Sequence, residues 1–488
     1  MSEPVISKEA IAALKIAAID AYMSDQNYGR QGDVYMHFDG NDYEGCYYEV
    51  FAPDEEASGG GERFKVDFSG GVVGAREYLD SDFSKAFMQI KNGMDEILKP
   101  WMSMPEEADV DAVLSRFAGL MNGVSNGAGA GSSVAEGGAG DEIDLTFPEG
   151  VGFVSAARFW SDFDSMKNTE RPWLGLSGTA FRTKFVEGGK VVAENICAAL
   201  GACGCVIAAE KGAVVAVRRA LPEIVGKVTE AFKSQSPVSI PLEAFLSVVK
   251  LARAAFKLFV DVNVGNLIAV GDAVVDADKH IGEAGGVSVS GGGSYEQTVS
   301  VFVDLLQELS DKVLQVEKGC ETYLNKLASY ISMNVDRYDI SVQAITLDQV
   351  RESKDVSAEY SPETIDADCE HMDKVARSHM PPIAAAFKNL YATGIDLGFH
   401  GAIARDARIG LGQYGAAHKF SEVAGIILDY AKEFGDEMES GSKMLLAVSR
   451  EFRRTEEQQQ EKYDDLKVTL EEAIGDFKEK GPRPDDPI

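Results

Sequence analysis

The stretch VSVFVDLLQELSDKVLQVEKGCETYLNKLASY, residues Val299–Tyr330, decides the fold. Its apolar residues recur in steps of three and four over about four heptads, a spacing typical of a long helix that packs along its length against another helix. The positions of this seam are Phe302, Leu306, Leu309, Val313, Val316, Cys320, Tyr323, Leu327 and Tyr330.

Two further series repeat these steps. The first carries Glu, Asp, Lys and Ser on its outer faces and predicts a second long helix. The other has smaller side chains, so a partner helix can approach it closely. Residues 239–278 supply one more long apolar face. The first series is Phe420, Val423, Ile427, Tyr430, Phe434, Met438, Gly441, Leu445, Val448 and Phe452, and the second is Phe181, Phe185, Gly188, Val192, Ile196, Ala199, Cys203 and Val206.

These seams predict a mainly α protein of long antiparallel helical hairpins or a helix bundle. Alternation at Val34, Met36 and Phe38, followed by a turn signal, adds a small N-terminal α+β region. Two glycine-rich stretches divide the chain. The expected units are 1–121 as the α+β region, 122–141 as a flexible linker, 142–283 as a helical hairpin region, 284–294 as a Gly/Ser linker, 295–356 as a long helix, 362–480 as a second helical module and 481–488 as a tail.

The net charge of the chain narrows the classes of molecule that it could bind. Among 488 residues, 47 Lys and Arg face 79 Asp and Glu, which gives a net charge of −32. A protein that binds nucleic acid needs a basic stripe for the phosphate backbone, so we expect no nucleic-acid partner. Charge alone does not draw the chain to anionic lipid either.

The cysteines and the first residues bear on the compartment. Six cysteines spread along the chain argue against a small disulfide scaffold, and Cys203 and Cys205 have neither redox nor zinc spacing. The start of the chain has a helical apolar period with internal charges, so we expect no secretory signal peptide. The apolar run from Ile196 to Ala209 is too short to cross a bilayer before Glu210 and Lys211 interrupt it.

A helix-reversing motif stands between two helical runs. Pro172 and Gly175 break the helical backbone, and Trp173 is large enough to pack against both helices that meet at the turn. A helix with phenylalanines four residues apart, LSGTAFRTKFVEGGKVVAENI, follows directly. A plain structural turn with an aromatic plug is the alternative interpretation.

With this motif the sequence resembles the WXG family, the small helical-hairpin substrates of the type VII (ESX) secretion system of actinobacteria and firmicutes. The similarity covers roughly residues 153–232, with Trp173 and Gly175 as the turn motif. A second stretch, Gly410–Gln458, is similar to the C-terminal helix of ESX-secreted proteins, which suggests two modules in tandem. Phe399, His400 and Gly401 stand upstream of its helix, where the motif would have tryptophan first.

The resemblance also implies an export signal. In that group a helix ends in Tyr-x-x-x-Asp/Glu, which an export ATPase reads. The matching place holds Phe452 and Glu456, so the acid is present and phenylalanine replaces tyrosine. The literal match of Tyr78 with Asp82 follows no hairpin, and we treat it as chance.

Catalysis is not expected, because it needs a convergent set of titratable groups. The six histidines are scattered, and no phosphate loop, HExxH or GxSxG motif occurs. A solvated first helical turn explains the densest acidic group better than a metal site does. We expect no catalytic residue, no metal and no cofactor. The two groups considered are Asp366, Asp368, Cys369, Glu370, His371 and Asp373, and Asp272, Asp276, Asp278 and His280.

The expected function is that of a non-enzymatic type VII secretion substrate, or the targeting portion of one, made without a cleaved leader and then secreted or held at the cell surface. Its partners would be the export ATPase and a small helical protein or a second copy of itself. A helical pore former that inserts residues 196–217 into a membrane is one alternative. A cytoplasmic coiled-coil scaffold is another.

Overall fold

The computed structural model describes residues 5–31, 34–37, 47–51, 64–67, 76–122, 124, 133–136, 143–146, 159–167, 176–234, 238–239, 290–291, 293–341, 369–394 and 396–479. Within these ranges the protein is mainly α, as the seams predict. The helices are α1 Lys8–Asp25, α2 Arg76–Leu98, α3 Glu107–Asn122, α4 Phe159–Met166, α5 Leu176–Phe181, α6 Gly189–Ser234, α9 Tyr295–Met333, α11 Cys369–Lys374, α12 Met380–Gly394, α13 Phe399–Ala402 and α14 Ala417–Glu479. Short 3₁₀ turns, η1 Trp101–Ser103 and η3 Val335–Arg337, and π-helical segments, η2 Arg182–Gly188 and η4 Val375–His379, connect them.

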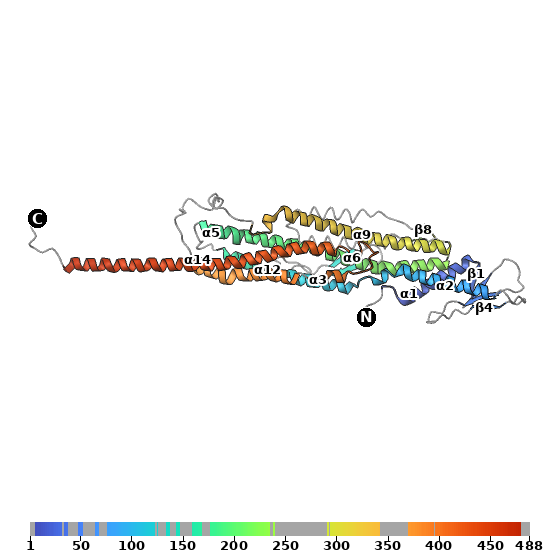
Figure 1. The fold of residues 1–488 in the computed structure, drawn as a ribbon. Helices are drawn as coiled ribbons and strands as arrows, with labels where there is room; N and C mark the ends of the chain where they lie inside the picture. The colour runs from blue at the N-terminus through green and yellow to red at the C-terminus, as the bar shows by residue number, and fades with distance from the viewer. Residues whose placement is uncertain are drawn as a thin grey trace, which may run out of the picture.

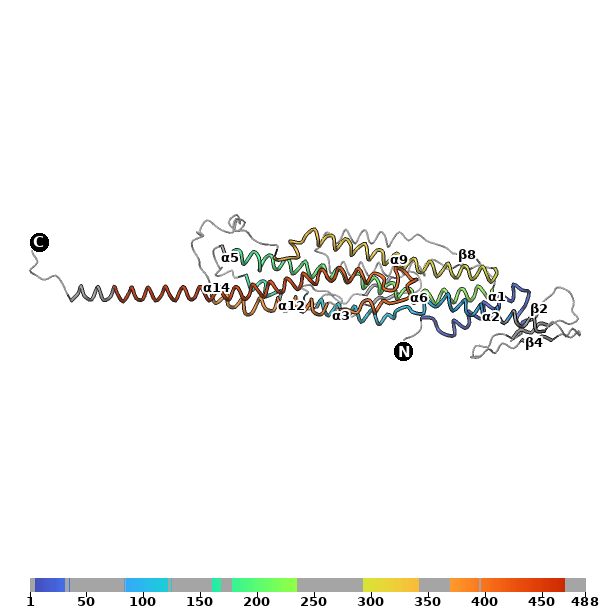
Figure 2. Tube along the Cα trace, viewed as in Figure 1, coloured from blue at the N-terminus to red at the C-terminus, as the bar shows by residue number. Residues whose placement is uncertain are grey.

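The helices lie lengthwise in an elongated molecule, and α6 runs through its middle (Figures 1 and 2). α6 packs against α1, α3, α9 and α14, while α12 packs along α14. One end of α14 extends well past the other helices, and the strands β1–β4 lie at the opposite end of the molecule (Figure 1). This arrangement places α6 where most of the apolar surface is removed from water.

The seam of α9 is buried along nearly its whole length. Eight of its nine predicted positions are buried, and Tyr330 at the end is half-buried. The seam of α14 is buried from Phe420 to Leu445, apart from half-buried Tyr430, and it becomes half-buried at Val448 and Phe452. Period-3.5 patterning therefore identified the packed faces of both helices.

The small-residue series is broken at its start. Residues Arg182–Gly188 form a π-helical segment, in which each turn holds an additional residue and the side-chain register shifts. Phe181, Phe185 and Gly188 are consequently only half-buried, and Val186 is buried instead. From Val192 to Val206 every predicted position is buried. Phe181 and Phe185 still pack against the core, so the predicted face is kept but is fully buried only from Val192 onward.

Three antiparallel sheets are present among the described residues. Strands β1 Tyr28–Gln31, β2 Val34–His37, β3 Tyr47–Phe51 and β4 Phe64–Asp67 pair in chain order. β5 Ser133–Glu136 pairs with β6 Ile143–Thr146, so the stretch expected to be a flexible linker contains a paired strand. β7 Val238–Ser239 pairs with β8 Ser290–Gly291, which brings together the two ends of the segment that includes the apolar residues 239–278. Residues 240–289 themselves lie outside the described ranges.

Helix α9 begins and ends at side-chain caps. The Ser294 hydroxyl accepts the backbone N–H of Gln297 at 3.3 Å, so the expected Gly/Ser linker ends in an N-cap. At the other end the Asn334 side chain donates to the carbonyl of Tyr330 at 2.8 Å. The helix stops at Met333, earlier than the predicted end at 356, because Asn334 leaves the helical conformation and a 3₁₀ turn follows.

Candidate functional site

Three charged residues meet in the buried middle of the molecule. Arg405 follows α13, Glu210 lies on α6 and Glu317 on α9, and all three side chains are 0–1% exposed. The guanidinium of Arg405 forms an ion pair with Glu317, and its Nη1 atom lies 3.8 Å from Glu210 Oε2. We call these three residues the buried ionic cluster. It joins two long helices to the loop that enters α14.

That loop, residues 403–416, is shaped to place its backbone against the two carboxylates. The N–H of Leu411 donates to Glu317 at 2.6 Å, and the N–H of Ala416 donates to Glu210 at 3.1 Å. Gly410 and Gly415 have φ of +62° and +46°, and a Cβ atom at either position would collide with a carboxylate oxygen of Glu317. Only glycine meets both the backbone and the space requirement there.

Burial dominates the electrostatics of the buried ionic cluster. It raises the pKa of Glu210, an effect that Arg405 and the N–H of Ala416 oppose. It lowers the pKa of Arg405, and Glu210 opposes that shift. With two carboxylates and one guanidinium, the fully ionised cluster carries one negative charge in an apolar surrounding. The loop donates backbone N–H groups to both carboxylates, so this cluster holds the loop in place. Because solvent does not reach the cluster, it offers no site for a substrate.

A second buried charge follows directly in the sequence. Lys211 is 1% exposed, and its Nζ atom lies 2.6 Å from Asp111 Oδ1 and 3.8 Å from Glu107 Oε1, both on α3. Glu210 and Lys211 therefore point to different neighbours of α6. In the sequence this pair stands at the end of an apolar run, and the run alone predicts no buried partner for either charge. Two adjacent charges of opposite sign inside such a run were the available signal, because buried charges need partners.

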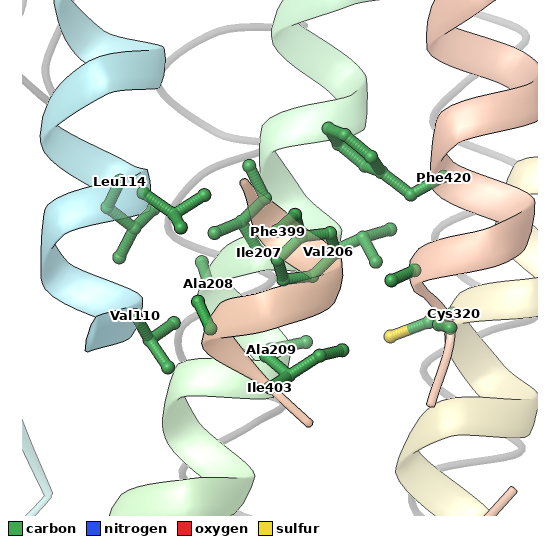
Figure 3. Packing of buried hydrophobic residues seen from close by; sticks show 14 of the residues in the cluster. Val110, Leu114, Val206, Ile207, Ala208, Ala209, Cys320, Phe399, Ile403 and Phe420 are labelled. Atoms are coloured by element: carbon green, nitrogen blue, oxygen red, sulfur yellow. The ribbon is translucent and has the colours of Figure 1, made fainter. Parts of the chain in front are cut away.

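Apolar side chains surround this region. Figure 3 shows Val110 and Leu114 of α3, Phe399 of α13, Ile403 just after it, and Phe420 of α14 gathered around residues 206–209 of α6. The rings of Phe399 and Phe420 meet edge to face with centroids 5.0 Å apart. The small side chains of α6 thus let α13 and the loop after it approach the helix closely.

Two imidazoles face each other beside the loop. His400 Nε2 of α13 and His418 Nδ1 of α14 are 3.2 Å apart, and the Tyr414 ring packs edgewise on both rings. His400 is half-buried and His418 is exposed. Burial, and next the proximity of His418, lower the pKa of His400. His400 also lines a groove of about 440 Å³ between α12, α13 and α14.

The residues predicted from the family resemblance are placed as follows. Trp173 and Gly175 lie outside the described residues. Phe452 and Glu456 are one turn apart on α14, with Phe452 half-buried against the core and Glu456 exposed. Arg453 makes a last contact with the body, donating to the carbonyl of Cys369 at 3.1 Å and pairing with Asp373 at 3.1 Å. Every residue from 454 to 469 is exposed.

Only some of the candidate metal-binding residues lie within the described parts of the chain. In the described parts of the chain no group of three or more His, Cys, Asp or Glu side chains could hold a metal ion. Cys203 and Cys205 are buried, and burial raises the pKa of both thiols. Asp366, Asp368 and the group Asp272–His280 lie outside the described residues. Asp373 accepts contacts from Ser449 and Arg453, which lower its pKa and make it part of the α11–α14 contact.

One described helical stretch, Gly178–Ser234, is long and apolar enough to cross a membrane, and 78% of its most apolar window is buried inside the protein. A core helix has the same properties, so this stretch does not by itself identify a membrane protein. Comparisons of the chain with protein-family models, with curated proteins and with solved structures found no match.

Proposed function

We propose that this chain is a non-enzymatic substrate of a type VII secretion system, or the targeting portion of one, and that it acts by packing helices against other proteins. The proposal rests on the resemblance around Trp173 and on the end of α14. The observation that carries it is the exposure of α14 from residue 454 to residue 469, a stretch that begins just after Phe452 and includes Glu456. A receptor can reach a helix that the body leaves uncovered.

Contacts on both sides of the Trp173 segment support a helical hairpin. Trp160 Nε1 and Cys197 Sγ both donate to the carbonyl of Val124, at 3.0 and 3.4 Å. Asp164, which follows Trp160 by four residues, pairs at 3.0 Å with Lys190, which precedes Cys197 by seven. Contacts that pair later residues of one helix with earlier residues of the next are those of antiparallel segments joined by a turn.

The proposed partners follow from the family resemblance. The export ATPase would recognise the face of α14 that carries Phe452 and Glu456, because residues four apart lie on one side of a helix. A small helical protein, or a second copy of this chain, would pair with the exposed end of α14. Tyr463 and Leu466 are 66% and 68% exposed there and offer apolar surface for such pairing.

The test is secretion of the full chain by a bacterium with an intact type VII system. We expect Phe452→Ala combined with Glu456→Ala to remove the protein from the culture supernatant, as deletion of the export ATPase does. The matched control is Val303→Ala combined with Gln307→Ala, an exposed pair with the same spacing on α9. Equal secretion of the two double variants would contradict the signal assignment. Retention of the unaltered chain inside wild-type cells would favour a cytoplasmic scaffold.

A pore-forming role is the second candidate, and the apolar stretch Gly178–Ser234 favours it. In this alternative α6 would leave its neighbours and enter a bilayer, which requires Glu210 and Lys211 to part from Arg405 and Asp111. Dye release from vesicles of phosphatidylcholine and phosphatidylglycerol tests it. An unrelated helical protein at the same concentration is the control and should leave the vesicles intact. Dye release by this chain alone would support the pore, and no release would exclude it.

A further inference from the structure

The geometry points to a transition-metal site formed by His400 and His418, which an ion such as Zn²⁺ would occupy to clamp the loop between α13 and α14. The buried ionic cluster involves neither of these two side chains, and the resemblance to secretion substrates touches only His400, as the middle residue of Phe399–Gly401. The two residues belong to different helices and are separated by 18 positions in the chain. An ion held by both would close that span.

The distance between the two nitrogens suits one metal ion. Bonds of about 2.0–2.1 Å from Zn²⁺ to two imidazoles at the tetrahedral angle place the nitrogens about 3.3 Å apart. His400 Nε2 and His418 Nδ1 lie 3.2 Å apart, which matches the separation that one ion bound to both nitrogens requires. Imidazole nitrogen is also a preferred ligand of Zn²⁺, Ni²⁺ and Cu²⁺.

The hydrogen bond that the pair makes without metal does not block this exchange. A contact between two ring nitrogens requires one of them to carry a proton and the other to carry none. Moving the shared proton to the outer nitrogen of the same ring frees both inner nitrogens as ligands. Two neutral imidazoles then bind the ion with no net release of protons.

The surroundings leave room for the remaining ligands. His418 is exposed and His400 lies at the edge of the groove between α12, α13 and α14, so water can complete the coordination shell. Tyr414 packs edgewise on both rings and limits their rotation. A site with two protein ligands and water binds more weakly than a closed structural zinc site with four.

Binding would stabilise the loop that carries Arg405. The span from His400 to His418 contains the whole of residues 403–416, including the N–H groups of Leu411 and Ala416 that donate to the buried carboxylates. An ion that binds the folded loop and not the unfolded chain raises stability by mass action. The site would therefore tie the exposed imidazoles to the buried ionic cluster.

The experiment titrates the full chain with Zn²⁺ by isothermal calorimetry and repeats thermal unfolding with and without Zn²⁺. We expect binding of one equivalent and a higher unfolding temperature, with no effect from Mg²⁺, which imidazole binds poorly. His400→Ala and His418→Ala should each weaken binding by at least about tenfold, since one of two protein bonds is lost. His371→Ala, which removes an imidazole elsewhere, should leave binding unchanged.

Three outcomes would overturn the proposal. These are no heat of binding beyond that of Mg²⁺, unchanged Zn²⁺ affinity in both single variants, and equal loss of affinity in His371→Ala. Hydrogen exchange gives an independent reading, because Zn²⁺ should slow exchange of the Leu411 and Ala416 amides in the unaltered chain and not in His418→Ala. Unchanged exchange on addition of saturating Zn²⁺ would contradict the clamp.

Discussion

The middle of α6 and the end of α14 are both long helical stretches, and their surroundings are opposite. Residues 199–217 of α6 are all buried, including Glu210 and Lys211, whereas residues 454–469 of α14 are all exposed. Apart from Glu210 and Lys211 the first stretch is apolar on every side, and the second is charged or polar on most sides. A helix with apolar residues all round is stable only when neighbours cover it, and a polar one depends on its own backbone hydrogen bonds.

The two stretches also differ in how their charges contribute. The two buried charges of α6, Glu210 and Lys211, each meet a partner held by another element, so removal of the partner leaves an uncompensated buried charge. At the end of α14 water already solvates the charges, and pairs such as Arg454 with Glu451 add little. The comparison predicts large effects of substitution near α6 and small ones on the free end of α14.

The largest effect is expected for Arg405→Leu. This change leaves Glu210 and Glu317 buried without their cation, and we expect a loss of about 3–5 kcal/mol in the free energy of unfolding. Denaturation by urea measures it. Arg408→Leu is the control, because Arg408 is 58% exposed and pairs with Asp406 at the surface. Equal losses in the two variants would show that the buried position has no special weight.

Gly415→Ala should follow in size. At φ +46° an alanine is strained, and its Cβ would collide with carboxylate oxygens in the buried ionic cluster. We expect a loss of roughly 2 kcal/mol, measured in the same denaturation experiment. Gly425→Ala on α14 provides the opposite sign, because its Cβ meets no atom within 4 Å and a helical alanine is favoured by about 0.5–1 kcal/mol. A neutral Gly415→Ala would show that the loop is not fixed.

Glu210→Gln should change how the free energy of unfolding depends on pH more than it changes that free energy at neutral pH. Because burial raises the pKa of Glu210 above its ordinary value of 4.5, the folded state binds this proton more tightly than the unfolded state. This contribution to stability is present at low pH and is lost as pH rises from about 4.5 through the raised pKa. The variant removes that decline, and its amide oxygen can still accept from Ala416. Urea denaturation of both proteins across that range measures the difference, and parallel curves would contradict it.

The smallest effect is expected for removal of residues 454–488. The side chains from 454 to 469 are exposed, so the body should lose less than about 0.5 kcal/mol in unfolding free energy. Circular dichroism should show the loss of a helical signal together with an almost unchanged denaturation midpoint. A clear drop in the midpoint would mean that the end of α14 folds back onto the body.

The sequence predicted the packed faces of α9 and α14 closely. Their apolar residues repeat in steps of three and four, and the repeat holds in the structure because each helix keeps one face against its neighbours. The predicted face is less well covered at η2, where the backbone takes a π-helical turn and Phe181 and Phe185 are only half-buried against the core. The sequence also predicts too long a helix for α9. Apolar residues continue after Met333, so the pattern does not mark the end that Asn334 makes.

The candidate sites were less accessible to sequence reasoning. The buried ionic cluster joins residues 210, 317 and 405, and no local pattern links positions so far apart. In the sequence His400 and His418 are two of several scattered histidines. Only the folded loop between them brings the two rings together. Phe452 and Glu456, in contrast, lie on one helix, so their relative placement followed from spacing alone.

Local spacing by itself determined that the chain forms long helices and which face of each is apolar, since both depend on residues only three or four positions apart. Composition likewise determined its strongly acidic character. The tertiary structure alone decided that Glu210 and Lys211 could be buried, that the loop with Gly410 and Gly415 would meet two distant carboxylates, and that α14 would outrun its neighbours. Those outcomes depend on contacts between distant segments, whose energies no single helix contains.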